Sequence, residues 1–149
     1  MTRRFGKGEH GGVAVEGAIL VPLLILMTFG AVDASLLFIH SHRVEAGLTA
    51  GGSYLAQSQA NGLDELRARR IAVTGTPNPG GKSRLKGWSE TDVTISYKTV
   101  PNSGNFRGSA DVRVAKLTTA TPFRGFGILS GVTGGSLELK AEYETRLIR

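Results

Sequence analysis

The chain has 149 residues, no cysteine and a formal net charge of +6. This length allows one folded domain at most beside a membrane segment. The lack of cysteine excludes a lipid-modified cysteine anchor and means that no disulfide supports the fold.

An apolar run near the N-terminus is the first strong feature. Starting at Val13, twenty consecutive residues contain a single ionisable side chain, that of Glu16. Twenty helical residues extend about 30 Å, which is the thickness of the hydrocarbon core of a bilayer. We therefore expect a transmembrane helix over about residues 13–33.

The charges that flank this run predict its orientation. Arg3, Arg4 and Lys7 precede it with only Glu9 opposing them, whereas the first basic residue after it is Arg43. Because an excess of positive charge keeps its end of a span in the cytoplasm, we expect the N-terminus inside and the C-terminus outside. A cleaved secretory signal fits poorly, since its apolar core has only about 7–15 residues.

Glu16 lies where a carboxylate costs about 2.5–3.5 kcal/mol by insertion scales. One interpretation is that it marks the cytoplasmic edge of the span. The other is that it pairs with a cation at the same depth, although no Lys or Arg lies within a helical turn or two of it. A free α-amino group, made by cutting the chain just before Gly12, would supply that cation.

Three further positions in the span suggest packing roles. Pro22 predicts a kink or a place where the helix can melt, because proline removes a helical hydrogen bond. Gly30 and Ala34 form a small-x-x-x-small pair that would let another helix approach closely, unless the helix simply contains small residues. Asp33 is expected to mark the outer edge of the span, with a salt bridge to a partner subunit as the alternative.

Beyond the span the helix is expected to continue to about residue 60. Apolar and small residues recur at alternating steps of four and three, which is the pattern of an amphipathic helix. The positions are Leu37, Ser41, Val44, Leu48, Gly51 and Leu55. Gly47, Gly51 and Gly52 each lower helix propensity by up to about 1 kcal/mol relative to alanine, so we expect a globular part to cover this seam.

Residues 61–149 are expected to form an extracytoplasmic α+β domain. Asn61-Gly62 has turn chemistry, and the charge order of residues 62–73 suits a short helix. The basic loop 75–90 contains Gly-Lys-Ser, but a phosphate-binding P-loop would need glycine at position 76, which is Thr76. We therefore do not expect nucleotide binding, and the basic residues of 62–73 are attributed to a solvated helix end rather than to a nucleic-acid site.

Alternating apolar and polar residues predict strands at about residues 91–100, 109–118 and 136–147. The short connection between the first two favours an antiparallel pair. The expected fold class is therefore α+β and pilin-like: a long N-terminal transmembrane helix, about residues 12–60, whose outer half packs on a small antiparallel sheet.

Residues for catalysis or metal binding are scarce. The three histidines are His10, His40 and His42, and the last two lie about 200° apart around a helix, which makes a poor metal pair. No nucleophile lies in an activating motif. We expect no enzymatic activity, no cofactor, no metal and no small-molecule substrate.

The N-terminal third resembles a known family. Residues 11–16, GGVAVE, resemble a type IV prepilin processing site. The longer run VAVEGAILVPLLILMTFGAVD is similar to the TadE-like pseudopilins of tight-adherence (Tad) pili, with Pro22 six residues after Glu16 and an acid, Asp33, three residues after Gly30. One departure is Gly17, where relatives usually carry Phe or Tyr.

This resemblance implies a function in pilus assembly. Prepilin peptidase would cut between Gly11 and Gly12 and remove a basic leader, residues 1–11, after which Glu16 would neutralise the new α-amino group. The protein would be a pseudopilin or minor pilin of the bacterial inner membrane that primes or tips a fibre and enters it. Its implied partners are prepilin peptidase, other pilins and pseudopilins, the Tad inner-membrane assembly platform and the lipid bilayer.

Two alternatives remain open from the sequence. The protein could be an uncleaved single-pass scaffold, which the departure at Gly17 permits. It could also bind an acidic polymer or DNA through its basic external domain, which steep salt dependence would reveal.

Overall fold

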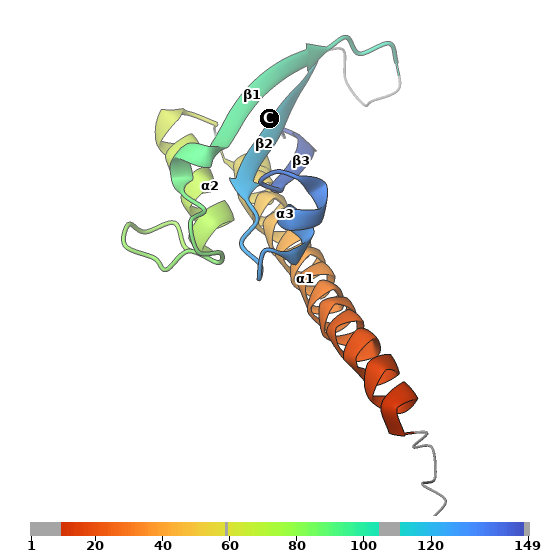
Figure 1. The fold of residues 1–149 in the computed structure, drawn as a ribbon. Coiled ribbons are helices and arrows are strands. Elements are labelled where there is room, and N and C mark those ends of the chain that lie inside the picture. The colour runs from red at the N-terminus through yellow and green to blue at the C-terminus, as the bar shows by residue number, and fades with distance from the viewer. Residues whose placement is uncertain (1–9, 59, 105–110, 148–149) are drawn as a thin grey trace, which may run out of the picture.

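The computed structural model describes residues 10–58, 60–104 and 111–147. It consists of a rod and a head (Figure 1). The rod is the N-terminal half of the helix α1 (His10–Gln57), most of which projects away from the other elements. The head contains the outer half of α1 and the elements that follow it along the chain: α2 (Gly62–Thr74), a 3-10 turn η1 (Glu90–Asp92), β1 (Val93–Val100), β2 (Val112–Pro122), α3 (Ile128–Thr133) and β3 (Glu138–Arg146).

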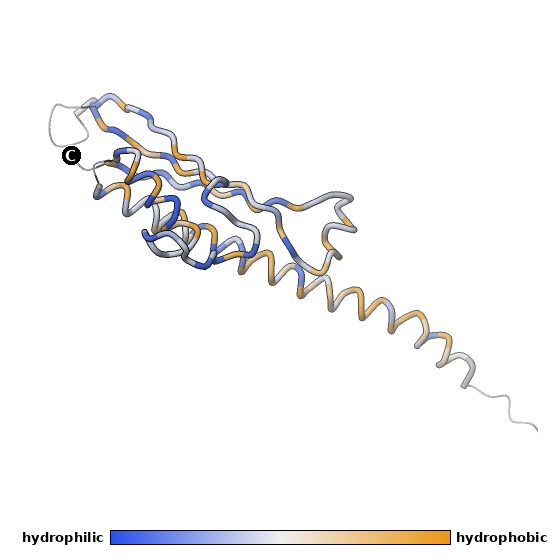
Figure 2. The backbone as a smooth tube through the Cα atoms, turned by 90° about the vertical axis from the view of Figure 1, so that its left-hand side faces the viewer, coloured by the Kyte–Doolittle hydropathy of each residue, from blue (hydrophilic) through white to orange (hydrophobic). Residues whose placement is uncertain are grey.

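The three strands form one antiparallel sheet in the order β1-β2-β3. Val93 pairs with Thr119 and Val100 with Val112 on one side of β2, and Leu117 pairs with Tyr143 on the other. The helix α2 and the outer half of α1 lie together on one side of this sheet (Figure 2). The expected α+β fold, a long helix packed on a small antiparallel sheet, is confirmed.

The core lies between the helices and the sheet, entirely in the outer half of the molecule. Its fully buried members come from α1, α2 and β2: Val44, Leu48, Leu55, Ala68, Ala72, Ala115 and Leu117. Trp88 closes one end of the core, and its indole Nε1 donates to the Thr119 hydroxyl at 3.0 Å. That hydroxyl donates in turn to the Asp92 carbonyl at 2.8 Å, so the polar groups of this buried corner are satisfied.

The glycines of α1 allow its neighbours to approach closely. A Cβ added at Gly51 would lie 2.6 Å from the Ala68 carbonyl oxygen of α2, and one at Gly47 would collide with the Ala72 carbonyl oxygen. On another side, a Cβ at Gly52 would lie 2.5 Å from the Tyr143 ring of β3. The glycines that weaken the helix locally are therefore the points where α2 and β3 touch its backbone.

Two features differ from the pattern in the sequence. The stretch between the second and third strands contains the short helix α3, for which the sequence analysis predicts neither a helix nor a strand. β2 runs on to Pro122, beyond the expected end at residue 118, because Thr119 and Thr121 are buried and continue to pair with β3. The expected start of this strand at residues 109–110, and residues 1–9 of the expected leader, lie outside the described residues.

Candidate membrane-anchoring and assembly segment

The N-terminal half of α1 presents a largely exposed apolar surface, and its contacts with the head lie at its outer end, at residues 29–33. Its most apolar 18-residue window has a mean hydropathy of 2.1, and none of that window is buried. Figure 2 shows this half as an almost continuous hydrophobic stretch. Among the described residues, α1 is the one helix long and apolar enough to cross a membrane. Because exposing so much apolar surface to water is unfavourable, the segment is suited to lipid or to other helices.

The candidate processing site lies in the first turn of α1. The helix begins at His10, so the bond between Gly11 and Gly12 is helical here. Apart from the adjacent residues and the backbone of the same turns of α1, no atom of the described residues lies within 4 Å of the position that a Cβ would take at Gly12. The described part of the chain therefore leaves this face of Gly12 open.

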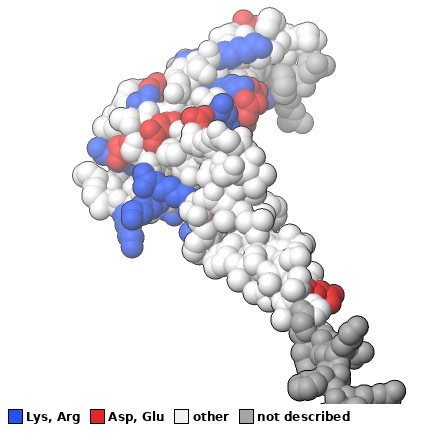
Figure 3. Space-filling view, in the orientation of Figure 1, with Lys and Arg blue, Asp and Glu red and all other residues white. Residues whose placement is uncertain are grey.

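Glu16 lies on the exposed surface of the rod. No Lys, Arg or His of residues 10–58, 60–104 and 111–147 forms an ion pair with it. In Figure 3 the projecting half of α1 is white except for a single acidic spot. Within the described ranges, the Glu16 carboxylate therefore has no ion-pair partner.

Pro22 and Gly30 both lie within the uninterrupted helix. Pro22 is exposed and α1 continues through it. Gly30 is half-buried, and a Cβ there would lie 3.8 Å from the Ile128 Cγ2 of α3. The surface of Gly30 therefore faces an element of its own chain, which the sequence analysis does not anticipate.

Asp33 is buried in the contact between α1 and the α3 segment. Its Oδ1 accepts the backbone N–H of Phe126 at 2.5 Å, and its Oδ2 accepts those of Ile128 at 2.9 Å and Leu129 at 3.3 Å. The carboxylate thus satisfies amides at the start of α3, which is a favourable place for a negative charge. The structure adds a contact that the sequence analysis does not anticipate, a clasp between two segments more than 90 residues apart in the sequence.

Gly125 makes room for this clasp. A Cβ at Gly125 would collide with the Asp33 Oδ1 and would lie 2.7 Å from the Phe123 ring. Gly127, at the start of α3, has a φ of 92°, a conformation that residues with a Cβ rarely adopt. The sequence signal that could have revealed the clasp is Gly-Phe-Gly, residues 125–127, together with an acid in an apolar helix that needs donors.

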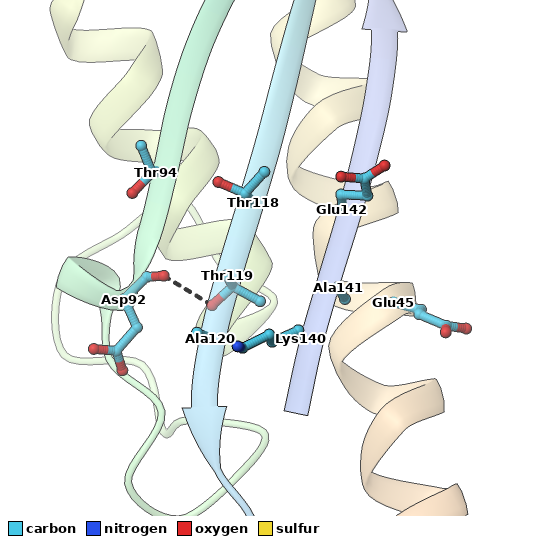
Figure 4. Close-up of a pocket in the computed structure, with 9 residues that line it drawn as sticks. All are labelled: Glu45, Asp92, Thr94, Thr118, Thr119, Ala120, Lys140, Ala141 and Glu142. Carbon is cyan, nitrogen blue, oxygen red and sulfur yellow. Dashed lines mark hydrogen bonds between the residues drawn. The ribbon is translucent and has the colours of Figure 1, made fainter. Parts of the chain in front are cut away.

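A hollow on the head carries no convergent chemistry. It lies at one end of the sheet and is lined by Glu45, Asp92, Thr94, Thr118, Thr119, Ala120, Lys140, Ala141 and Glu142. Figure 4 shows that its three carboxylates come from different elements and do not point toward one another. Across the described ranges, no group of three or more His, Asp or Glu side chains could hold a metal ion.

The fold and the exposed segment together define a class. A long helix with a free apolar half, whose other half packs on a small antiparallel sheet, has the pilin-like architecture expected from the sequence. The family model of TadE-like proteins matches residues 11–53, so the resemblance to this family is confirmed over that segment. The match begins at Gly11, includes Glu16, Pro22, Gly30 and Asp33, and ends within the outer half of α1. Searches of the curated proteins and of the solved structures give no match.

Proposed function

We propose that this protein is a pseudopilin or minor pilin that helps to initiate or tip a Tad-like type IV pilus. The observation that carries the proposal is the TadE-like match over residues 11–53, within which Glu16 lies on an exposed apolar helix without a cationic partner among the described residues. The role is structural, so the subunit acts by anchoring and packing rather than by catalysis.

The first step of the proposed function is processing of the N-terminus. Prepilin peptidase cuts between Gly11 and Gly12, removes the basic leader of residues 1–11 and leaves a new α-amino group. Glu16 becomes the fifth residue of the mature chain, about 6 Å along the helix from that amine. The amine can therefore neutralise Glu16 of its own subunit or of a neighbour, which offsets the cost of a carboxylate in an apolar environment.

The second step is transfer from membrane to fibre. Before assembly, the apolar half of α1 spans the bacterial inner membrane with the head on the extracytoplasmic side, the orientation favoured by Arg3, Arg4 and Lys7. The Tad inner-membrane assembly platform then moves the helix into a bundle formed with other pilins and pseudopilins. The apolar surface exchanges lipid for neighbouring helices, so little of it meets water at any stage.

The test is the identity of the N-terminus in membrane and sheared-fibre fractions of the native host. Mass spectrometry should find chains that begin at Gly12. Glu16→Ala should abolish incorporation into fibres and leave membrane insertion intact, whereas the control Glu45→Ala, which removes an exposed acid from the same helix, should be incorporated normally. Fibres containing the intact leader would overturn the proposal.

A variant at Gly11 separates this proposal from an uncleaved membrane scaffold, the alternative that Gly17 leaves open. Replacing Gly11 by a bulkier residue should block cleavage and fibre entry. If fibres form normally with this variant and its leader stays attached, anchoring without processing is the correct function.

A further inference from the structure

The segment between β2 and β3 lies beside the outer end of the candidate span. The rings of Phe29 in α1 and Phe126 pack edge to face with their centroids 5.7 Å apart. Gly30 faces Ile128, and Asp33 holds the start of α3. Residues 126–129 therefore sit at the same level along the rod as residues 29–33. In Figures 1 and 2 this segment extends from the head toward the apolar half of α1.

This segment is apolar and exposed. From Gly125 to Leu137 it contains no charged residue, although Arg124 and Glu138 flank it. The side chain of Phe126 is 63% exposed and that of Val132 is 79% exposed. Together with the exposed Phe29 and Val32 of α1, they extend the apolar surface of the rod sideways onto the head. An exposed apolar surface that continues that of the candidate span is suited to the same apolar surroundings.

The hydrogen bonds of the segment also suit an apolar environment. Asp33 accepts the amides of Phe126, Ile128 and Leu129, which a short helix would otherwise leave to water. The Ser130 hydroxyl donates to the Gly127 carbonyl at 3.0 Å, and the Thr133 hydroxyl donates to the Leu129 carbonyl at 2.9 Å. Backbone outside a regular helix can enter a membrane only when its polar groups are satisfied within the protein.

A basic cluster lies beside α1, farther from its N-terminus than Asp33. Arg43, Arg84, Lys86 and Arg124 line one cavity together with His40, and no acid lines it. None of these four cations has an ion-pair partner within the described ranges. His40 is seven residues beyond Asp33, or about 10 Å along a helix. The headgroup region adds about 5–8 Å on each side of the hydrocarbon core, so the cluster lies just outside it, and long Arg and Lys side chains can reach back to the phosphates. Figure 3 shows a basic patch on the side of the head that faces the rod.

We propose that this underside of the head docks on the outer surface of the bilayer that α1 spans. Phe126 and Val132 enter the edge of the hydrocarbon, and Arg43, Arg84, Lys86 and Arg124 bind the phosphates of anionic phospholipids. The inference rests on the membrane anchor of the proposed function. Docking at two levels fixes the tilt and rotation of the head before the subunit leaves the membrane, which a single helix by itself does not do.

The lack of cysteine makes the depth of single positions measurable. Three variants of the full chain, Val132→Cys, Leu24→Cys and Ser103→Cys, are labelled with an environment-sensitive fluorophore. Each is reconstituted at low protein density in vesicles of phosphatidylcholine and phosphatidylglycerol with nitroxide-bearing lipids. Leu24 reports on the span, and Ser103, exposed beyond the end of β1, reports on the far end of the head.

Labels at Leu24 and Val132 should be strongly quenched, and the label at Ser103 should stay unquenched. Quenching at Leu24 with a Val132 label that behaves like Ser103 would overturn the docking and leave the anchor intact. An unquenched Leu24 label would instead refute the anchor. If Val132 becomes shielded only as protein density rises, the surface binds a second copy, and lipid docking is wrong.

The basic cluster is tested by charge removal. Arg84→Gln combined with Lys86→Gln should reduce the quenching at Val132 in vesicles containing phosphatidylglycerol and should change little in vesicles of phosphatidylcholine alone. Lys98→Gln combined with Lys140→Gln removes the same charge from exposed positions on the sheet and should have no effect. Equal behaviour of the two double variants would remove the basic cluster from the proposal.

Discussion

Two acids at the ends of one apolar segment differ in burial and in their bonding partners. Asp33 is buried and accepts three backbone amides of the same chain, whereas Glu16 is exposed and has no ion-pair partner among the described residues. An uncompensated carboxylate in an apolar environment is costly. Of these two acids, Glu16 is therefore the one that would gain from a cationic partner on another subunit or at a new N-terminus. The clasp at Asp33 therefore acts within one chain, and Glu16 is the acid to which we assign the proposed role in assembly.

Replacing Asp33 should loosen the α3 segment selectively. Asp33→Ala leaves the amides of Phe126, Ile128 and Leu129 without their charged acceptor, so their hydrogen exchange should accelerate by about tenfold or more. Exchange in the β1-β2 ladder should be unchanged. Glu45→Ala, an exposed acid on the same helix, serves as the control. Unchanged exchange at the three amides would show that the clasp does not hold the segment.

His40 should make the head sensitive to mild acid. Burial, aided by the charge of Arg43, lowers the pKa of His40 below its ordinary value of 6.5. The unfolded chain then binds this proton first as the pH falls, so stability is present above about pH 6.5 and decreases below it. Thermal unfolding of the full chain in a neutral detergent, followed from pH 8 to pH 5, measures this loss.

Substitution identifies the group responsible. His40→Asn should flatten the pH dependence between about pH 5 and 6.5, because no proton can be taken up at that position. His42→Asn removes an exposed histidine two residues away and should retain the slope. A slope that survives in His40→Asn would assign the acid sensitivity to another group.

At the scale of elements, the three glycines of the outer half of α1 decide how the head packs. They bring α2 within contact of the α1 backbone on one side and Tyr143 of β3 on the other. Propensity alone makes these glycines look like weak points of a helix. Their contacts show that the lower helix propensity is offset by close packing between elements.

Gly51→Ala tests this trade. The substitution gains about 1 kcal/mol of helix propensity, but the new Cβ would lie 2.6 Å from the Ala68 carbonyl oxygen. Overpacking of this kind costs about 1–3 kcal/mol, so the melting temperature should fall. Gly62→Ala, where nothing lies within 4 Å of the added Cβ, should leave it unchanged or raise it. A stabilised Gly51→Ala variant would contradict the close packing of α1 and α2.

At the scale of the whole molecule, the head and the anchor divide near residue 35. The buried hydrophobic residues begin at Val44 and include none from the apolar half of α1. The two halves of one helix therefore differ: the outer half packs in the core of the head, and the N-terminal half leaves its apolar surface largely exposed. Among the described residues, Asp33 and the apolar contacts around Gly30 connect the N-terminal half of α1 to the head.

A fragment of residues 36–149 should consequently be soluble and should unfold cooperatively, because it retains the entire core. A second fragment of residues 60–149 lacks Val44, Leu48 and Leu55 and should fail to fold. Circular dichroism during heating and size-exclusion chromatography distinguish the two outcomes. An unfolded or aggregated 36–149 fragment would mean that the apolar half of α1 contributes to folding of the head.

Hydrophobic periodicity and an uncharged run are local properties of the chain, so the long helix and the small antiparallel sheet could be predicted without the fold. The TadE-like segment was identified by its resemblance to that family, which the family model matches over residues 11–53. The clasp between Asp33 and residues 126–129, the short helix α3 and the close contacts at Gly47, Gly51 and Gly52 were decided only by the tertiary structure. Each depends on which distant segment meets α1, and residue types near one position do not specify a partner up to 96 residues away.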